Sequence, residues 1–357
     1  MEEEVKNGQS AADVETVSDK ENFNDNLHGE NLTERAKVLS PGMTVLKRFF
    51  RSKLSVIGLV VLIALFLFSF IGPLFSPWGA NEADVKSNIN FTVTTIPYEV
   101  DGEIYYCYDV TLDETTYNIL GGISSDHIMG TDDSGYDVFT RLMKGGQVSL
   151  TIGFVVVILE TLLGVLLGGL AGYFGKWVDQ LIMRIVDVLS CIPTLPILLI
   201  LSAIFESLKI VDISKLYYMM IVLTLLGWTS VARLVRGQIL SLREQEFMLA
   251  AKSSGLSTAK KIFKHLLPNV IPQLIVFMTL GLGSIILYEA TLGYLGIGAP
   301  LGTATWGNLI NMASNATYRN FYPNLWLGSG ICITLAILAF NFVGDGLRDA
   351  FDPKMKR

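Results

Sequence analysis

Three acidic side chains stand inside long apolar stretches of the sequence: Glu160, Asp187 and Glu289. A charge is costly in hydrocarbon, so such residues mark a solute path, a proton relay or a polar contact between helices. Arg184 lies three residues before Asp187, on the same helical face, and we expect a structural ion pair there. Glu289 would line a pathway or bond to a neighbouring helix. Glu160 is where a proton-coupled transport mechanism would have to begin.

The sequence predicts no catalytic residue and no metal site. Three cysteines are too few and too scattered for a metal site, and the three histidines fall outside the apolar stretches. Gly175-Lys176 approaches the end of a phosphate-binding loop, but Leu170 and Trp177 break the required spacing. An intramembrane enzyme is therefore not expected, and ATP chemistry would have to come from another polypeptide.

The elements that carry these acids are membrane helices. Of 357 residues, 51% are hydrophobic and only 17% are charged, whereas soluble domains carry about 25% charged residues. A bilayer core requires about 20 apolar residues of helix. Six stretches meet or approach that length: Leu54–Phe75, Val148–Tyr173, Ile185–Phe205, Leu216–Ala232, Val270–Gly298 and Leu325–Val343. We predict an all-α polytopic membrane protein with six transmembrane helices, the third interrupted at Pro193 and Pro196.

The distribution of basic residues orients these helices. Of the 27 Lys and Arg, 21 lie in the N-terminal region, the 174–184 and 233–269 loops and the C-terminus. The first opposite segment, 76–147, holds twelve acids. The positive-inside rule therefore places both termini and the 233–269 loop in the cytoplasm.

The chain divides by composition into five regions. Residues 1–40 are predicted to be a disordered acidic cytoplasmic tail, because few of them could be buried in a core. A basic lead-in and the first transmembrane helix follow over 41–78, then an extracytoplasmic insertion over 79–126. Asp101-Gly102 in that insertion predicts a small β-hairpin. Residues 127–350 form the remaining helical core, and 351–357 a cytoplasmic end.

The stretch FMLAAKSSGLSTAKKIFKHLLPN, residues 247–269, is predicted to form two short helices. The first ends at Gly255, which suits a left-handed position. Ser257 would cap the second, which would stop at Pro268. Its apolar residues recur at helical spacing between lysines, so it could lie on the lipid headgroups or dock a cytoplasmic partner. Transmembrane helices on both sides argue against a DNA-binding role.

The spacing of this stretch resembles the signature loop of the membrane subunits of ABC importers. That loop reads Glu-Ala-Ala, three residues, Gly, nine residues, Ile, one residue, Leu-Pro, and it marks the ATPase docking site. Here Leu249-Ala250-Ala251, Gly255, His265 and Leu267-Pro268 have the matching spacing, with Leu249 replacing the Glu and His265 the Ile. The resemblance implies a coupling loop over 240–268, with Phe247 also presented to the ATPase.

Further motifs are similar to the C-type permease subunit of dipeptide, oligopeptide and nickel importers. They are Leu46–Leu54, Gly130–Leu142, Trp306-Gly307-Asn308 and Asn341–Asp349 with Asp352-Pro353. Glu289 also matches a Glu frequent in the family. The second motif contains Gly130, Thr131, Asp132, Asp133, Gly135 and Asp137. We expect it to form a turn at the outer mouth, capped by Thr131 or Asp132, with a structural or gating role.

The resemblance implies six transmembrane helices of the ABC importer permease type and alternating access driven by ATP. The expected partners are a second homologous permease, two ATPase subunits that bind ATP and Mg, and an extracytoplasmic substrate-binding protein. This chain would bind no cofactor and no nucleic acid. The expected location is the bacterial inner or plasma membrane. Peptides are the expected solute; nickel or another small solute, or a proton-coupled secondary transporter, are the alternatives.

Overall fold

The computed structural model describes residues 41–87, 91–100, 103–112, 116–210, 214–300 and 302–352. The predicted tail 1–40, the predicted turn residues Asp101-Gly102 and the last five residues lie outside this part. The chain divides into two units, 1–46 and 47–357. Of the first unit only residues 41–46 are described, and they begin helix α2 (Pro41–Arg51).

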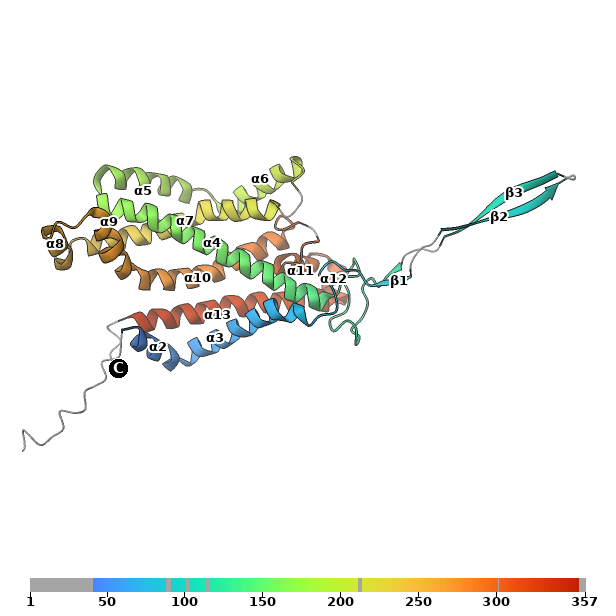
Figure 1. Ribbon diagram of the computed structural model, residues 1–357, viewed down its shortest axis with the longest axis horizontal. Helices are drawn as coiled ribbons and strands as arrows, with labels where there is room; N and C mark the ends of the chain where they lie inside the picture. Colours follow the sequence, from blue (N-terminus) through green and yellow to red (C-terminus); the bar gives the residue numbers. More distant parts are fainter. Residues whose placement is uncertain are drawn as a thin grey trace, which may run out of the picture. The chain divides into compact units, whose positions relative to one another are not determined.

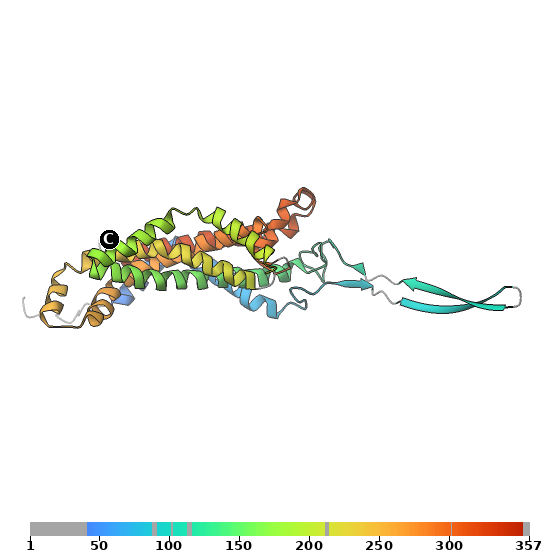
Figure 2. The same cartoon turned by 90° about the horizontal axis from the view of Figure 1, so that it is seen from above.

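Long helices of the second unit lie side by side along the horizontal axis of Figures 1 and 2. The principal packed pairs are α4 with α7, α3 with α13, and α10 with both α13 and α4. The helices of this unit in the described residues are α3 (Lys53–Phe66), α4 (Val138–Phe174), α5 (Lys176–Ser190), α6 (Thr194–Ser207), α7 (Ser214–Leu242), α8 (Glu246–Ser253), α9 (Thr258–Lys260), α10 (Leu267–Tyr294), α11 (Trp306–Asn311), α12 (Ala316–Phe321) and α13 (Leu327–Phe351). Short π or 3-10 turns are η1 (Leu67–Ile71), η2 (Gly72–Leu74), η3 (Lys261–Leu266), η4 (Met312–Ser314) and η5 (Pro323–Leu325).

Five helical segments of the described chain are long and apolar enough to cross a membrane, and a sixth span results if one bent pair is counted. The five are Lys53–Leu74, Val138–Phe174, Ser214–Leu242, Thr258–Tyr294 and Leu327–Phe351. The bent pair is α5 and α6, which meet at 75°. Pro193 lies in this break, where a residue without an amide hydrogen cannot continue the helix. The predicted all-α polytopic fold and the break at Pro193 are confirmed, whereas Pro196 lies in the first turn of α6 and does not interrupt it.

Small residues let α4 and α7 approach closely. Gly164, Gly168 and Gly172 recur one turn apart on α4, and a Cβ at Gly168 would collide with the backbone of Ala232 on α7. At Gly172 it would lie 2.9 Å from Ile239 Cβ. These glycines therefore bring the two helix backbones into close contact, where dispersion contacts replace the missing hydrophobic driving force.

The segment between η2 and α4 contains the strands of the described chain. Strand β1 (Val85–Ser87) pairs with β4 (Thr116–Tyr117), and β2 (Phe91–Val100) pairs antiparallel with β3 (Glu103–Leu112). The register runs from Phe91 opposite Leu112 to Val100 opposite Glu103, so two residues connect the strands. The predicted β-hairpin is confirmed in its two paired strands, while the predicted turn residues Asp101-Gly102 lie outside the described residues.

The helix after Gly255 does not stop at Pro268, contrary to the prediction. It runs on from Thr258 to Tyr294, and Pro268 stands in the first turn of α10. The preceding residues 261–266 are π-helical, and the Leu267 amide donates to the Ile262 carbonyl five residues back. The wider π-turn changes the local hydrogen-bond register ahead of the proline, and a first helical turn tolerates a residue without an N–H.

Candidate functional site

The segment 246–266, which we call the α8–η3 segment, lies at one end of the long helices, opposite α11 and α12 (Figure 1). Gly255 separates its two helical parts and has φ of +68°, a left-handed conformation that glycine adopts without strain. Ser257 precedes the second helix with extended backbone angles, but its side chain makes no capping hydrogen bond. The predicted helix–turn–helix is therefore present, with a backbone turn in place of the predicted side-chain cap.

Two buried side chains hold this segment on the helix bundle. Met248 of α8 and Leu266 of η3 are both completely buried. They belong to one apolar cluster with Ile239 of α7 and Val270 of α10. Burying a large aliphatic side chain stabilises its position by about 1.5–3 kcal/mol. The turn at Gly255 is thus fixed from both sides.

Several exposed side chains of the same segment are apolar as well. The side chains of Phe247, Leu249 and Phe263 are 37%, 54% and 65% exposed. Ala250 is exposed beside them, and so are Lys260 and Lys264. Exposed aromatic and aliphatic side chains on a rigid support are typical of a surface that binds another protein.

Not all of the predicted docking residues lie on this face. Ala251 is 6% exposed and packs inward, so it cannot be presented to a partner as the sequence predicted. The reason is the helical period, because Ala251 lies three residues after the buried Met248. His265 and Leu267 are half-buried at the inner edge, whereas Pro268 is exposed.

Arg236 of α7 and Arg243, the residue after α7, connect this end of the bundle to neighbouring helices. Arg236 donates from Nε to Asp179 Oδ1 at 2.8 Å and from Nη2 to Asp179 Oδ2 at 2.6 Å, a bidentate pair between α7 and α5. Arg243 donates to the Gly172 carbonyl of α4 at 3.1 Å. These contacts link α7, from which α8 continues, to α4 and α5. Local spacing gave no signal for them, because the partners lie more than fifty residues apart.

Asp187 has a different partner from the one predicted. Arg233 Nη2 donates to Asp187 Oδ1 at 3.2 Å and to Ser190 Oγ at 3.0 Å. An ion pair between Arg184 and Asp187 is absent from the described chain. Asp187 therefore pairs with Arg233 of the neighbouring helix α7 and not with Arg184, which lies three residues back on its own helix.

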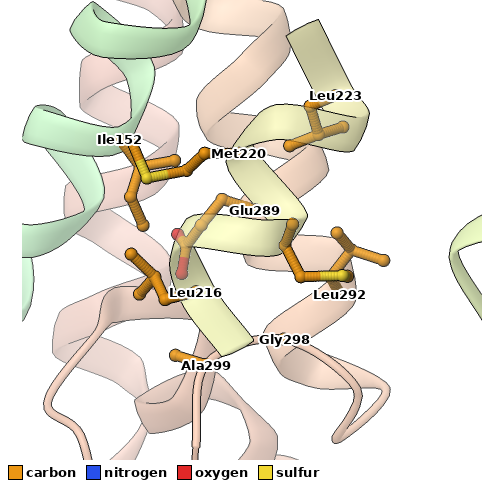
Figure 3. Close-up of a pocket in the computed structure, with 9 residues that line it drawn as sticks. Ile152, Leu216, Met220, Leu223, Glu289, Leu292, Gly298 and Ala299 are labelled. Atoms are coloured by element: carbon orange, nitrogen blue, oxygen red, sulfur yellow. The ribbon is translucent and has the colours of Figure 1, made fainter. Parts of the chain in front are cut away.

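Glu289 makes an interhelical hydrogen bond in a confined space. Its Oε2 accepts from Ser149 Oγ at 2.8 Å, and Ser149 Oγ accepts from the Trp306 amide at 3.1 Å. Figure 3 shows the carboxylate among apolar side chains, including Leu216 and Met220. The cavity there measures about 20 Å³, enough for about one water molecule and too small for a solute. Of the two roles that the sequence left open, this geometry favours the contact between helices.

Glu160 lies in different surroundings. Its side chain is 8% exposed, and it lines a cavity of about 390 Å³ between the α5–α6 bend, α7 and α10. Its Oε1 is buried without a hydrogen-bond partner in the described part of the chain. Glu160 is thus the predicted acid that faces a space large enough for a solute.

The Gly130–Asp137 motif folds into a compact turn before α4. Asp132 Oδ1 accepts from the amides of Ser134 and Tyr136, both at 2.9 Å, and its Oδ2 lies 3.1 Å from Arg141 Nη1. Thr131 Oγ1 accepts from the Gly121 amide at 2.8 Å. Burial raises the pKa of the Asp132 carboxyl, although Arg141 and the two amides act in the opposite direction.

The cap of α4 is Asp137, not Thr131 or Asp132 as predicted. Asp137 Oδ2 accepts from the Thr140 amide at 2.7 Å, and Oδ1 lies 3.0 Å from His127 Nδ1. His127 Nε2 is 3.3 Å from Asp84 Oδ2, and its ring stacks on Trp78. Gly130 and Gly135 both have φ of +78°, so the turn continues through Gly135. Helix α4 therefore begins after Asp137, later than a cap at Thr131 or Asp132 would allow. Asp133 stays at the surface, 3.4 Å from Tyr318 Oη.

The amino-acid sequence matches two family models. One is described as "Binding-protein-dependent transport system inner membrane component" and covers residues 164–357. The other, "N-terminal TM domain of oligopeptide transport permease C", covers residues 40–92.

Curated relatives match over nearly their whole length. The oligopeptide transport system permease protein OppC of Bacillus subtilis (strain 168) is 34% identical over 326 residues, which is 90% of this chain and 92% of that protein. The dipeptide transport system permease protein DppC of Alkalihalophilus pseudofirmus is 34% identical over 318 residues, 89% of this chain and 91% of that protein. A solved structure of the MetNI methionine ABC transporter in an inward-facing conformation is 19% identical, with a TM-score of 0.47 over 59% of this chain and 97% of that chain.

The membrane-length helices define a polytopic membrane protein. The chain belongs to the family of binding-protein-dependent transport system inner membrane components, the membrane permeases of ABC importers. Members of this family are transport subunits and not enzymes.

Proposed function

We propose that this chain forms half of the translocation pathway of an ATP-driven peptide importer and docks an ATPase through its α8–η3 segment. The exposed apolar side chains of Phe247, Leu249 and Phe263 carry the docking proposal, since their segment is anchored by the fully buried side chains of Met248 and Leu266. The peptide class is supported by the names of the curated relatives, which are oligopeptide and dipeptide permeases.

The assembly contains a second homologous permease, two ATPase subunits and an extracytoplasmic substrate-binding protein. The ATPases hold ATP and Mg, while this chain supplies the membrane path and binds no cofactor. The chain lies in the bacterial inner membrane with both termini and the α8–η3 segment in the cytoplasm. The distribution of lysine and arginine supports this orientation.

ATP-dependent closure of the ATPases would move the α8–η3 segment as a rigid body, because both its helical parts are anchored in the bundle. Arg236 and Arg243 would pass that movement from α7 to α5 and α4. The outer turn of Asp132 and Asp137 has a structural or gating role at the start of α4. The movement would open the pathway alternately to the two sides of the membrane.

Reconstitution tests this function directly. The chain, its second permease, the ATPases and the binding protein are placed in liposomes, and uptake of labelled trialanine is followed with and without ATP. We expect uptake only in the complete assembly with ATP. Uptake by the chain alone would contradict the importer and indicate a secondary transporter, and uptake of nickel but not of trialanine would contradict the peptide class.

A surface variant tests the docking site separately. Phe263→Asp should weaken ATPase binding by about 2 kcal/mol, roughly 30-fold in affinity, as at a typical hot spot. Co-purification of the ATPase with the permease measures the effect. Phe321→Asp is the matched control, because Phe321 is 76% exposed on α12 at the other end of the helices. Equal ATPase recovery for both variants would contradict docking at the α8–η3 segment.

A further inference from the structure

The side chain of Glu160 reaches from α4 to the surface of α7 at a position where α7 has no side chain. A Cβ atom at Gly227 would overlap the Glu160 carboxylate, so the glycine leaves the space that the carboxylate occupies. The carboxylate forms part of the wall of the cavity of about 390 Å³ described above. The glycine on α7 thus allows an acid of α4 to face the cavity.

The cavity itself is polar enough to hold water. Its wall includes the hydroxyl-bearing residues Ser190, Thr194, Ser230 and Ser284. It is open to the outside of this chain, because Arg233 at its edge has a side chain 48% exposed and Tyr288 is 38% exposed. An acid at membrane depth next to such a cavity faces water or a solute and not lipid.

Among the buried acids of the described residues, Glu160 is the one with neither a hydrogen bond nor an ion pair to another residue, whereas Glu289 leaves only its Oε1 without a donor. Asp132 accepts from two amides and faces Arg141, and Glu289 accepts from Ser149. Glu160 Oε1 is buried with no hydrogen-bond donor in the described part of the chain, and no lysine or arginine forms an ion pair with it there. A buried carboxylate without a donor is costly, so a partner from outside the chain would stabilise it.

We propose that the Glu160 carboxylate binds the ammonium group of the transported solute inside this cavity. The proposal rests on the proposed import of peptides and adds a recognition point within the membrane. Ammonium is the cation that every unmodified peptide carries at its amino terminus, and lysine side chains carry a second one. The carboxylate would accept hydrogen bonds from the ammonium and neutralise its charge along the path.

Transport by the complete assembly distinguishes the two sources of ammonium. Uptake of trialanine, acetyl-trialanine and acetyl-Ala-Lys-Ala is compared between the unaltered chain and Glu160→Gln, so that the contribution of the binding protein cancels for each solute. We expect Glu160→Gln to slow trialanine about tenfold and acetyl-trialanine little, since one charge pair of about 1.4 kcal/mol is removed. If Glu160→Gln slows acetyl-Ala-Lys-Ala as much as trialanine, the lysine ammonium also binds. If Glu160→Gln changes the uptake of all three solutes by the same factor, the proposal is overturned.

A second measurement does not depend on the solute. In a chain without its native cysteines, Ser230→Cys places a thiol in the cavity wall one helical turn from Gly227. A cationic thiosulfonate should label it faster than an anionic one, and Glu160→Gln should reduce that ratio about tenfold. An unchanged ratio overturns the proposal even if peptide import is confirmed. A reduced ratio without peptide uptake keeps the cation site and contradicts only the peptide class.

Three controls complete the design. Glu160→Asp keeps the charge and should retain most of the labelling ratio. Glu206→Gln removes a carboxylate that is 57% exposed and does not line the cavity, so it should leave the ratio unchanged. Thr317→Cys places the thiol on exposed α12, where Glu160→Gln should have no effect on the ratio. A change in the Thr317→Cys ratio would mean that Glu160→Gln alters the fold, and would overturn the local interpretation.

Discussion

Met248 of α8 and Leu266 of η3, on opposite sides of the Gly255 turn, lie in one fully buried apolar cluster. The cluster continues through Val235 and Ile239 of α7 and Val270 of α10. The segment that exposes Phe247, Leu249 and Phe263 is therefore built into the helix bundle. A rigid connection of this kind is what mechanical coupling between subunits requires.

Met248→Ala should loosen α8 without disturbing the membrane helices. Large-to-small changes at buried sites cost about 2–5 kcal/mol, and here the cost falls on a short helix with few other anchors. We expect faster proteolysis between residues 246 and 257 in membrane vesicles and loss of ATP-driven uptake. Leu249→Ala is the matched control, since Leu249 is 54% exposed and should leave the proteolysis rate unchanged. Equal protease resistance of the two variants would show that Met248 is not the anchor.

Gly255 is held at a φ of +68°, and replacement tests whether the turn transmits motion. Gly255→Ala should cost about 1–2 kcal/mol locally, because a Cβ disfavours the left-handed conformation. Gly255→Pro should abolish uptake, since proline fixes φ near −65°. Membrane levels measured by immunoblot should stay normal for both variants. Their loss would instead show that the turn is required for folding.

The control for this position is another glycine with free space around it. Gly237 lies within helix α7, and no atom lies within 4 Å of the position that its Cβ would take. Gly237→Ala should be tolerated or slightly stabilising, because alanine favours the helix. A similar loss of uptake in Gly237→Ala would mean that both effects arise from added bulk at this end of the bundle.

Arg236 and Asp179 form the bidentate pair between α7 and α5, with side chains 35% and 17% exposed. A double-mutant cycle with Arg236→Ala and Asp179→Ala should give a coupling energy of about 1 kcal/mol in detergent unfolding, at the upper end for partly exposed pairs. Arg236→Lys should lose much of it, because lysine cannot donate in a planar fork.

The same double-mutant cycle on Arg233 and Asp187 provides the control. This pair has a single hydrogen bond, and its side chains are 48% and 57% exposed. Solvent screening should bring its coupling energy close to zero. Equal coupling energies for the two pairs would show that bidentate geometry contributes nothing here.

The sequence predicted the transmembrane helices well, because long apolar runs need no partner to be recognised. It also located the break before Pro193, since proline acts on its own backbone. The hairpin was predicted from the turn signal of Asp101-Gly102. In each case the signal lies within about 20 neighbouring residues.

Contacts between segments far apart in the sequence could not be predicted. Asp187 pairs with Arg233 of α7 and not with Arg184, and nothing in local spacing indicates which helix packs alongside. Ala251 was expected on the docking face but is buried, because the rotation of α8 is set by Met248. That methionine could have been found by asking which residue of α8 shares a face with Ala251. The depth of Glu160 in a cavity, by contrast, depends on Gly227 of another helix.

Asp137 joins the start of α4 to the preceding insertion, and its replacement tests the role of the outer turn. Its Oδ2 caps α4 through the Thr140 amide, while Oδ1 faces His127, which also faces Asp84. Asp137→Ala removes both contacts and should lower the unfolding free energy by about 1–3 kcal/mol. Asp137→Asn keeps an oxygen for the cap and should cost less. Asp133→Ala is the surface control, and detergent unfolding of all three variants measures the effect; equal stability of Asp137→Ala and Asp133→Ala would show that the cap does not hold the turn in place.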